Sequence, residues 1–253
     1  MSDNEITFND EQLLHYSRQI MLPHFGIEGQ QKLRDAHVVL MGVGGLGSPA
    51  AMYLAASGIG SLTLVDFDIV DNSNLQRQII HTIDSIGQSK VSSAKDTLLK
   101  INPDTAVHCI DGQLTQDELE ALISDASCVI DATDNFETRF LINRACVARQ
   151  VALVTAAAIQ FEGQISVFDL RQKDSACYAC LYAETGEENT TCSENGILAP
   201  VVGILGSMQA LEAIKLICGI GDCLHNRLLI FDALALQWRT MKLSKDTSCK
   251  VCS

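Results

Sequence analysis

Two cations and a carboxylate, Arg77, Lys90 and Asp134, occur in this 253-residue chain at positions that suit the binding of a triphosphate. A guanidinium and an ammonium neutralise phosphate oxygens, and a carboxylate can hold the magnesium ion that accompanies them. Each residue also has an ordinary alternative role. Arg77 or Lys90 could be a solvated surface charge, and Asp134 could be the N-cap of a following helix. Their joint occurrence favours ATP as the ligand.

A glycine-rich segment, VVLMGVGGLGSPAA at residues 38–51, would bring phosphate close to these charges. An apolar strand leads into a tight turn, and the helix that follows presents its N-terminus to anions. The turn contains Gly42, Gly44, Gly45 and Gly47. Asp66 ends the next expected strand, about 20 residues on, where an acid can bind ribose hydroxyls. Because NAD and ATP share this ribose, the loop alone leaves the nucleotide open.

Four of the ten cysteines form two CxxC pairs, Cys177 with Cys180 and Cys249 with Cys252. Two such pairs are typical of a tetrahedral zinc site, and four thiolates would leave no open position, so the metal would be structural. Two redox pairs or plain buried cysteines are the alternatives. Cys192 lies apart, in the polar segment 183–195 that we expect to be a mobile surface loop. Its thiol is either a nucleophile or idle.

Strands and helices alternate along the first 150 residues, which predicts a Rossmann-like, doubly wound α/β fold with a mostly parallel sheet. Strands are expected at residues 38–41, 61–65, 106–110 and 128–132, and helices at residues 46–57, 89–100, 116–124 and 137–149. Ligands of such sheets bind beyond the carboxyl ends of the strands. The loops after these strands should therefore bring Asp66, Arg77 and Asp134 together.

We expect one continuous domain over residues 1–253, with a helical N-terminal arm at 1–35 and a nucleotide-binding half at 36–150. The remaining half, 151–253, should begin with a buried strand at residues 151–158 and contain further strands at residues 163–170, 228–233 and 236–243, as an added antiparallel C-terminal half. Residues 201–218 are apolar except for Gln209, Glu212 and Lys215, which follow one another at three-residue steps. That spacing makes a polar stripe on a helix and predicts a mostly buried helix rather than a membrane span.

The net charge of −13 excludes most nucleic-acid partners, because the sequence has no basic stripe to neutralise phosphates. The opening MSDNEITFND is polar and acidic, unlike a signal peptide. Ten cysteines without such a signal indicate reduced thiols or metal ligands rather than disulfides. We expect a cytoplasmic protein without nucleic-acid or membrane partners.

YSRQI, GVGGLGSPAA, LVDFD, SNLQRQ, Lys90, DATDN and the CxxC pairs together resemble the ThiF/MoeB family of ubiquitin-activating-like adenylyltransferases. The resemblance covers residues 16–252. It implies that ATP and the C-terminal Gly-Gly carboxylate of a small ubiquitin-like sulfur carrier protein give an acyl-adenylate and pyrophosphate. It also implies bound Mg²⁺, oriented by Asp134, and a structural zinc ion. The implied nucleotide-binding residues are Gly42, Gly44, Gly45, Gly47, Asp66, Asp68, Ser73, Asn74, Gln76, Arg77, Lys90, Asp134 and Asn135.

The same resemblance implies a homodimer in which Arg18, from YSRQI, reaches the ATP of the partner subunit. It implies a later thiol role for Cys192 and a separate protein as sulfur donor. AAIQFEGQISVF and VDFDIV resemble the molybdopterin branch of the family, with a MoaD-type carrier, more than the thiamine branch with a ThiS-type carrier. A nicotinamide- or flavin-dependent oxidoreductase and a non-catalytic zinc-stabilised binding module remain as alternatives. Neither of these would need Arg77, Lys90 and Asp134.

Overall fold

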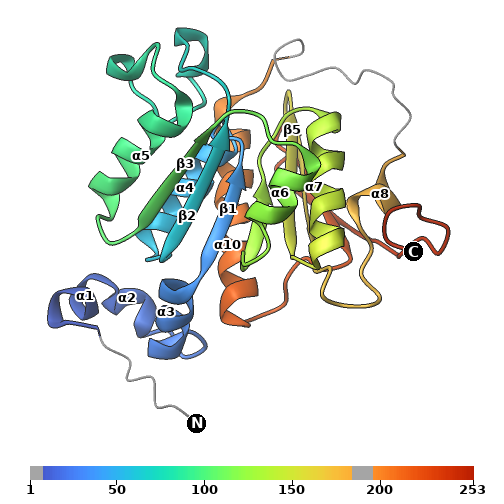
Figure 1. The fold of residues 1–253 in the computed structure, drawn as a ribbon, viewed down its shortest axis with the longest axis horizontal. Coiled ribbons are helices and arrows are strands. Elements are labelled where there is room, and N and C mark those ends of the chain that lie inside the picture. Colours follow the sequence, from blue (N-terminus) through green and yellow to red (C-terminus); the bar gives the residue numbers. More distant parts are fainter. Residues whose placement is uncertain (1–7, 184–195) are drawn as a thin grey trace.

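The structure is a computed structural model that describes residues 8–183 and 196–253. One eight-stranded sheet runs through it in the order β3-β2-β1-β4-β5-β6-β7-β8 (Figure 1). The first five strands are parallel, and the last three join antiparallel. The strands are β1 (His37–Met41), β2 (Ser61–Asp66), β3 (Ala106–Asp111), β4 (Cys128–Asp131), β5 (Leu153–Ile159), β6 (Glu162–Phe168), β7 (Arg227–Asp232) and β8 (Gln237–Lys242). The predicted α/β fold with an antiparallel C-terminal half is confirmed.

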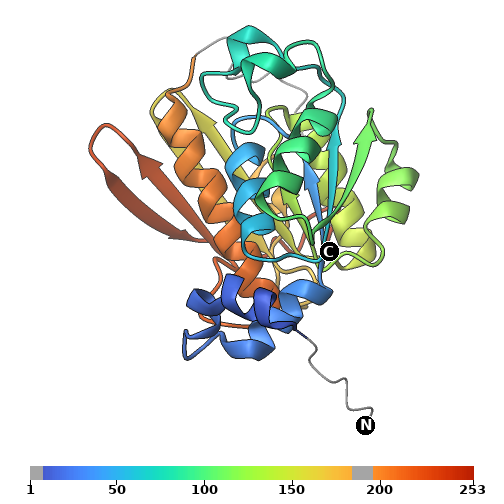
Figure 2. The same ribbon diagram turned by 90° about the vertical axis from the view of Figure 1, so that its left-hand side faces the viewer.

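Helices cover both faces of the parallel strands (Figures 1 and 2). One face carries α4 (Gly47–Ala56), α5 (Lys90–Ile101) and α10 (Ala199–Cys218), and the other carries α6 (Gln116–Leu122) and α7 (Phe136–Arg149). Alternate side chains of β1 enter two separate cores: Val38 and Leu40 join the first, and Val39 joins the second. A strand that is buried on both faces needs a continuous apolar run, which is why VVLM precedes the glycine loop.

The N-terminal arm forms three short helices, α1 (Asp10–His15), α2 (Ser17–Ile20) and α3 (Gly26–Asp35). The chain breaks helical geometry at Tyr16 and again around Pro23, because proline lacks the amide donor that a helix interior needs. Gln19 donates a 2.7 Å hydrogen bond to the Ser57 carbonyl at the end of α4. The arm therefore lies at the amino end of the parallel strands.

α10 is long and apolar enough to span a membrane by length and composition, yet half of its apolar window is buried inside this fold. Pro200 lies in its first turn, and Gly219 ends it in a left-handed conformation. Two residues of the polar stripe, Gln209 and Glu212, are buried and bond the backbone of neighbouring segments. This confirms the predicted buried helix, which begins two residues earlier than expected.

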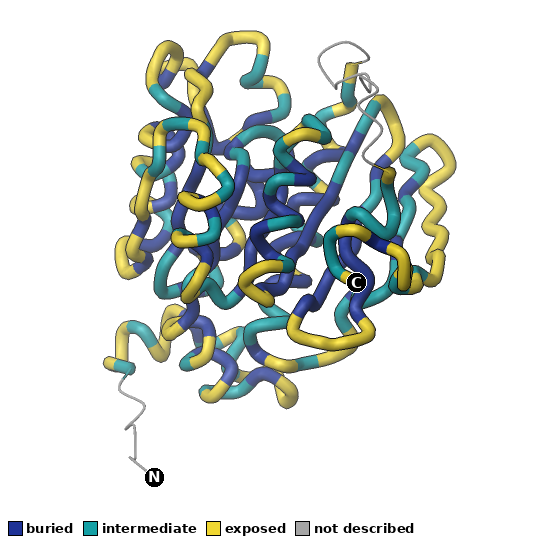
Figure 3. The backbone as a smooth tube through the Cα atoms, turned by 45° about the vertical axis from the view of Figure 1, so that its right-hand side comes forward, coloured by how far each residue is buried: buried dark blue, intermediate teal, exposed yellow. Residues whose placement is uncertain are grey.

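The C-terminal half adds the short helix α8 (Tyr178–Leu181) and the β7–β8 hairpin, which extends away from the body of the molecule (Figure 2). Backbone burial is concentrated in the central strands and the helices that flank them, while the outer loops are exposed (Figure 3). All six residues of β8 are exposed. The polar segment predicted to be a loop lies almost wholly outside the described residues.

Candidate active site

A cavity of about 490 Å³ opens beyond the carboxyl ends of β1, β2 and β4. This is the edge at which doubly wound sheets bind their ligands. Its walls contain nine of the thirteen nucleotide-binding candidates: Gly42, Gly44, Gly45, Asp66, Asp68, Arg77, Lys90, Asp134 and Asn135. Segments that are far apart in the sequence therefore meet here, as the strand-end argument predicted.

A second groove, of about 610 Å³, lies at the other end of α10. It is a weaker candidate for an anion site, because its cations already have partners. Arg171 pairs with Asp169 at 2.6 Å, and Lys215 pairs with Glu212 at 2.5 Å. Arg227 donates to the Cys223 carbonyl at 2.6 Å. We therefore place the site in the first cavity.

The glycine loop is shaped by close backbone contacts that only glycine allows. Gly42 has φ of +88°, and a Cβ there would lie 2.9 Å from the Ala132 carbonyl oxygen. A Cβ on Gly47 would lie 2.0 Å from the Gly42 carbonyl oxygen. A side chain at either position would displace the loop, so the approach of α4 to β1 depends on these glycines.

Asp66 ends β2 and holds the glycine loop in place. Its Oδ2 accepts a 2.7 Å hydrogen bond from the Val43 amide, and its Oδ1 accepts one of 2.9 Å from the Asp68 amide. Burial raises the pKa of Asp66, while the Lys90 ammonium and these two amides oppose the rise. Each carboxylate oxygen keeps a further lone pair, so Asp66 can accept hydrogen bonds from sugar hydroxyls as well.

Lys90 is the first residue of α5, whose N-cap is Ser89. Its side chain is only 6% exposed, and its Nζ lies 2.7 Å from Oδ2 of Asp68, which is half-exposed. The ammonium is therefore held at the cavity wall before any ligand arrives. A bound phosphate would share or replace the Asp68 carboxylate as the partner of Lys90.

Arg77 follows the short 3₁₀ turn η1 (Asn72–Asn74). Asn74 Oδ1 accepts hydrogen bonds from Arg77 Nη2 at 3.1 Å and from Gln78 Nε2 at 3.2 Å. This turn directs Gln76 outward and places the buried Gln78 in the cavity wall instead. The Ser73 amide and hydroxyl both donate hydrogen bonds to the Asp71 carboxylate, and Ser73 does not line the cavity. Ser73 and Asn74 therefore stabilise the turn from outside the cavity.

Asp134 is not the N-cap of α7. The cap is Asn135, whose Oδ1 accepts a 2.9 Å hydrogen bond from the Thr138 amide. The capping alternative for Asp134 is therefore wrong, because the helix begins one residue later than that alternative required. Asp134 lines the cavity and makes no hydrogen bond or ion pair with any residue of the described ranges. A carboxylate in this position suits a hard cation such as Mg²⁺.

Sequence reasoning missed Arg139, which also lines the cavity and is only 7% exposed. Burial acts to lower its pKa, but the Asp131 carboxylate and the Tyr178 phenol outweigh it, so the pKa is raised. Arg139 lies in the first turns of α7, where a cation meets the positive end of the helix dipole. That unfavourable placement in FETRF was a signal that the sequence already contained.

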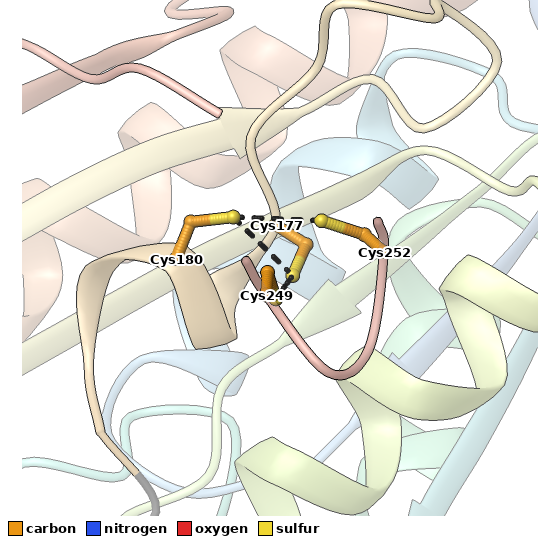
Figure 4. Close-up of side chains that lie close together, drawn as sticks. All are labelled: Cys177, Cys180, Cys249 and Cys252. Atoms are coloured by element: carbon orange, nitrogen blue, oxygen red, sulfur yellow. Dashed lines mark hydrogen bonds between the residues drawn. The ribbon is translucent and has the colours of Figure 1, made fainter. Parts of the chain in front are cut away.

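The four CxxC cysteines lie close together, two at α8 and two in the C-terminal segment (Figure 4). Their Sγ atoms all lie within 4.8 Å of one another. Sγ of Cys177 is 3.8 Å from that of Cys249, and Sγ of Cys180 is 3.4 Å from that of Cys252. A tetrahedral site with metal–sulfur bonds of about 2.3 Å requires sulfur separations of about 3.8 Å. The cluster could therefore hold one tetrahedral metal ion.

Donors around the cluster support thiolate ligands. Asn143 Nδ2 lies 3.6 Å from Cys177 Sγ, and the Asp246 amide lies 3.4 Å from Cys180 Sγ. Asn143 is buried, and its Oδ1 accepts a 2.9 Å hydrogen bond from the Tyr178 amide. Hydrogen bonds of this kind orient metal ligands and stabilise their charge.

Comparison with known proteins places this arrangement in a family. The model of the "ThiF family" matches residues 16–251. This chain belongs to the ThiF family. It is 46% identical over 244 residues to molybdopterin-synthase adenylyltransferase of Escherichia coli (strain K12), across 96% of this chain and 98% of that protein. It is 43% identical to the sulfur carrier protein ThiS adenylyltransferase of the same strain, across 96% of each.

Solved structures agree on the fold of this ThiF-family chain. E. coli MccB with ATP superposes with a TM-score of 0.84, covering 99% of this chain and 75% of that one at 24% identity. This likeness shows the fold alone. Because its close relatives are adenylyltransferases, the oxidoreductase and binding-module alternatives are no longer needed.

Arg18, another expected residue of the ThiF-family site, does not line the cavity. Arg18 is exposed on α2, at the amino end of the sheet, away from the cavity of its own chain. Cys192 lies outside the described residues. Of the remaining cysteines, Cys128, Cys146 and Cys218 are buried, and Cys109 is exposed.

His81 connects α5 to the glycine loop and should make stability depend on pH. Its Nε2 lies 3.1 Å from the Val43 carbonyl oxygen, and its Nδ1 lies 2.9 Å from Ser93 Oγ. A carbonyl only accepts, so Nε2 carries the proton and Nδ1 accepts from the hydroxyl. Burial lowers the pKa of His81 below its ordinary value, although the bond to Val43 opposes this.

Because the unfolded chain binds this proton more readily, His81 adds stability above about pH 6.5 that is lost as the pH falls toward the folded-state pKa. We expect His81→Gln to be less stable than the wild type at pH 7 and to lose less stability between pH 7 and 5. Urea unfolding at several pH values measures both slopes. Equal slopes for the two proteins would mean that His81 is not held neutral.

Proposed function

We propose that this protein uses ATP to adenylate the C-terminal Gly-Gly carboxylate of a small ubiquitin-like sulfur carrier of the MoaD type, in molybdopterin synthesis. The products are the acyl-adenylate and pyrophosphate. The observation that carries the proposal is the cavity that joins Asp66, Arg77, Lys90 and Asp134 to the glycine loop. The close similarity to molybdopterin-synthase adenylyltransferase supports the pathway. A ThiS-type carrier in thiamine synthesis is the second candidate, since that relative is nearly as similar.

In this proposal Asp66 binds the ribose hydroxyls, and Arg77 and Lys90 hold the phosphates near the glycine loop. Asp134 holds Mg²⁺, which neutralises charge on the phosphates when it is bound. The attacking carboxylate is already ionised at neutral pH, so no general base is needed. Its approach to the α-phosphorus is opposed by repulsion between anions. Arg77 and Lys90 reduce that repulsion and align the phosphate.

The four clustered cysteines are proposed to bind structural Zn²⁺. The sulfur separations fit tetrahedral geometry, and Asn143 and the Asp246 amide donate to two of the sulfurs. Cys177 and Cys249 are 72 residues apart in sequence. The metal would therefore tie the C-terminal segment to α8 and the main body.

A homodimer would explain two features of the surface. The outer face of α4 and α10 carries exposed apolar side chains: Tyr53 is 56% exposed and Leu211 is 54% exposed. A second copy packed on this face would bury them. It would also give Arg18, which lies away from its own cavity, a route to the ATP of the partner subunit.

The carrier is proposed to dock on the C-terminal half, beside the β7–β8 hairpin. β8 is an exposed edge strand that carries Arg239 and Lys242 together with Trp238 and Met241. In a chain of net charge −13, this basic and apolar edge suits an acidic carrier. Cys192 is proposed to act after adenylation, together with a separate protein as sulfur donor. The protein is proposed to be cytoplasmic, where its free cysteines would stay reduced.

The proposal is tested by exchange of labelled pyrophosphate into ATP, with purified MoaD-type and ThiS-type carriers compared side by side. We expect exchange only when Mg²⁺ and a carrier are both present, with the MoaD-type carrier preferred. Exchange with the ThiS-type carrier and none with the MoaD-type carrier would assign the protein to thiamine synthesis instead. No exchange with either carrier, combined with reduction of NAD or a flavin, would contradict the proposal.

A further inference from the structure

A buried pair, Asp131 and Arg139, lies directly beside Asp134 and has no part in the chemistry proposed above. Asp131 is 1% exposed and Arg139 is 7% exposed. Burying two charged groups carries a large hydration penalty for each, so their burial is not explained by stability alone. Arg139 also opposes the dipole of α7. Both side chains instead hold a neighbouring residue in place.

Asp131 and Arg139 both form hydrogen bonds with Thr133. Asp131 Oδ1 accepts hydrogen bonds from the Thr133 amide at 3.0 Å and from its hydroxyl at 2.6 Å. Arg139 Nη2 donates to the Thr133 carbonyl oxygen at 2.5 Å. Every polar group of Thr133 is thus bonded to one member of the pair. Asp134 is the next residue, so the direction in which its backbone leaves this turn is fixed.

Neighbouring elements anchor the pair and the turn. Asp131 Oδ2 accepts a 2.8 Å hydrogen bond from the Thr155 hydroxyl on β5. Gln209 on α10 donates to the Asp131 carbonyl at 2.7 Å, and Asn135 is fixed as the cap of α7. The residues on both sides of Asp134 are therefore held, while its own carboxylate makes no hydrogen bond or ion pair within the described ranges. Such a carboxylate is ready to meet a cation without rearrangement.

Arg139 is not placed to satisfy its own hydrogen bonding. Its Nε is buried and makes no hydrogen bond within ordinary geometric limits, although the Tyr178 phenol lies beside the guanidinium and helps to raise its pKa. Orphaned buried donors are uncommon, and each needs a reason. Here Nη2 of the guanidinium donates to Thr133, and the positive charge lies close to Asp131 and Asp134. This placement leaves Nε without an acceptor.

We propose that Arg139 is a positioning residue for the metal-binding carboxylate. With Asp131 it fixes the Thr133–Asp134 turn, so that Asp134 meets a divalent cation on the nucleotide in a preset orientation. The inference rests on the proposed role of Asp134 in the proposed function. A positioning role predicts a change in metal affinity, whereas a purely structural role predicts a change in stability alone.

The test is Arg139→Lys, which retains a charge but loses the planar fork that reaches Thr133. Replacing a partner that orients a metal ligand typically lowers metal affinity about 10- to 100-fold. We expect about tenfold more Mg²⁺ for half-maximal pyrophosphate exchange, with most of the rate recovered at saturating Mg²⁺. ATP binding in the presence of a chelator should be unchanged. Arg149→Lys, at the exposed end of the same helix, is the matched control and should behave as wild type.

A second readout does not depend on turnover: the affinity of Mn²⁺ for the protein–ATP complex, measured by electron paramagnetic resonance. Arg139→Lys should lower this Mn²⁺ affinity. Thr155→Val, which removes the hydrogen bond from the Thr155 hydroxyl to Asp131, should lower it by a smaller factor. If Arg139→Lys does not fold, Thr155→Val decides the question. Folded variants with wild-type Mn²⁺ and Mg²⁺ dependence would overturn the inference. A wild type that binds Mn²⁺–ATP yet catalyses no exchange would overturn the proposed function instead, and the Mn²⁺ affinities would still decide the role of Arg139.

Discussion

Arg77→Ala and Lys90→Ala are each expected to lower carrier-dependent pyrophosphate exchange by about 10²- to 10³-fold, the usual effect of removing one preorganised group that stabilises transition-state charge. Lys90 is held at the cavity wall, with its side chain 6% exposed, so its charge acts in a water-poor setting. Asp134→Asn should lower carrier-dependent pyrophosphate exchange to a similar extent, because the amide is a poor ligand for Mg²⁺.

ATP affinity should change only modestly in all three variants, since Asp66 and the glycine loop still contact the nucleotide. Calorimetric binding of ATP beside the exchange assay separates the two effects. Lys100→Ala, in the exposed last turn of the helix that begins with Lys90, is the matched control and should retain full activity. Near wild-type exchange in both Arg77→Ala and Lys90→Ala would mean that these are ordinary surface charges.

Loss of the metal from the cysteine cluster is expected to have the largest effect on stability. Protein purified without added metal should contain one zinc ion per chain, found by elemental analysis. Cys249→Ser should lower the free energy of unfolding by roughly 2–4 kcal/mol, or the Tm by about 5–15 °C, because a link that closes a long loop is lost. A strong chelator should have the same effect on the wild type.

The control for this experiment is Cys109→Ser, which alters an exposed cysteine outside the cluster. Its Tm should match that of the wild type. A protein that contains no zinc and keeps its Tm after Cys249→Ser would refute the structural metal site. A fall in Tm for both serine variants alike would point to a general cost of losing a thiol.

Much of the fold could be predicted because local pattern and global topology agree. The apolar run at β1, the glycines after it and the helix cap at Ser89 each specify one conformation, so the strand ends and Lys90 fall where expected. The N-terminal arm was less predictable. Its polar sequence has no strong apolar period, and contacts such as Gln19 with Ser57 decide where it bends.

Details of the site depended on turn geometry that periodicity does not encode. Whether Asp134 or Asn135 caps α7 is a shift of one residue, and it decides which of the two side chains spends its oxygen on the helix cap. The same holds for Gln76 and Gln78, which the turn after Asn74 sends in opposite directions. The sequence FETRF places Arg139 unfavourably near the start of α7, but the buried Asp131 that acts on its pKa became known only from the fold.

In the proposed function, this cavity joins adenylate to a carrier carboxylate. Mass spectrometry of a MoaD-type carrier, after incubation with the protein, ATP and Mg²⁺, tests it most directly. We predict a carrier heavier by one adenylyl group, with release of pyrophosphate and no adduct on a carrier that lacks its terminal glycine. An unmodified carrier in the presence of folded, ATP-bound protein, or an equal adduct on the truncated carrier, would contradict the account.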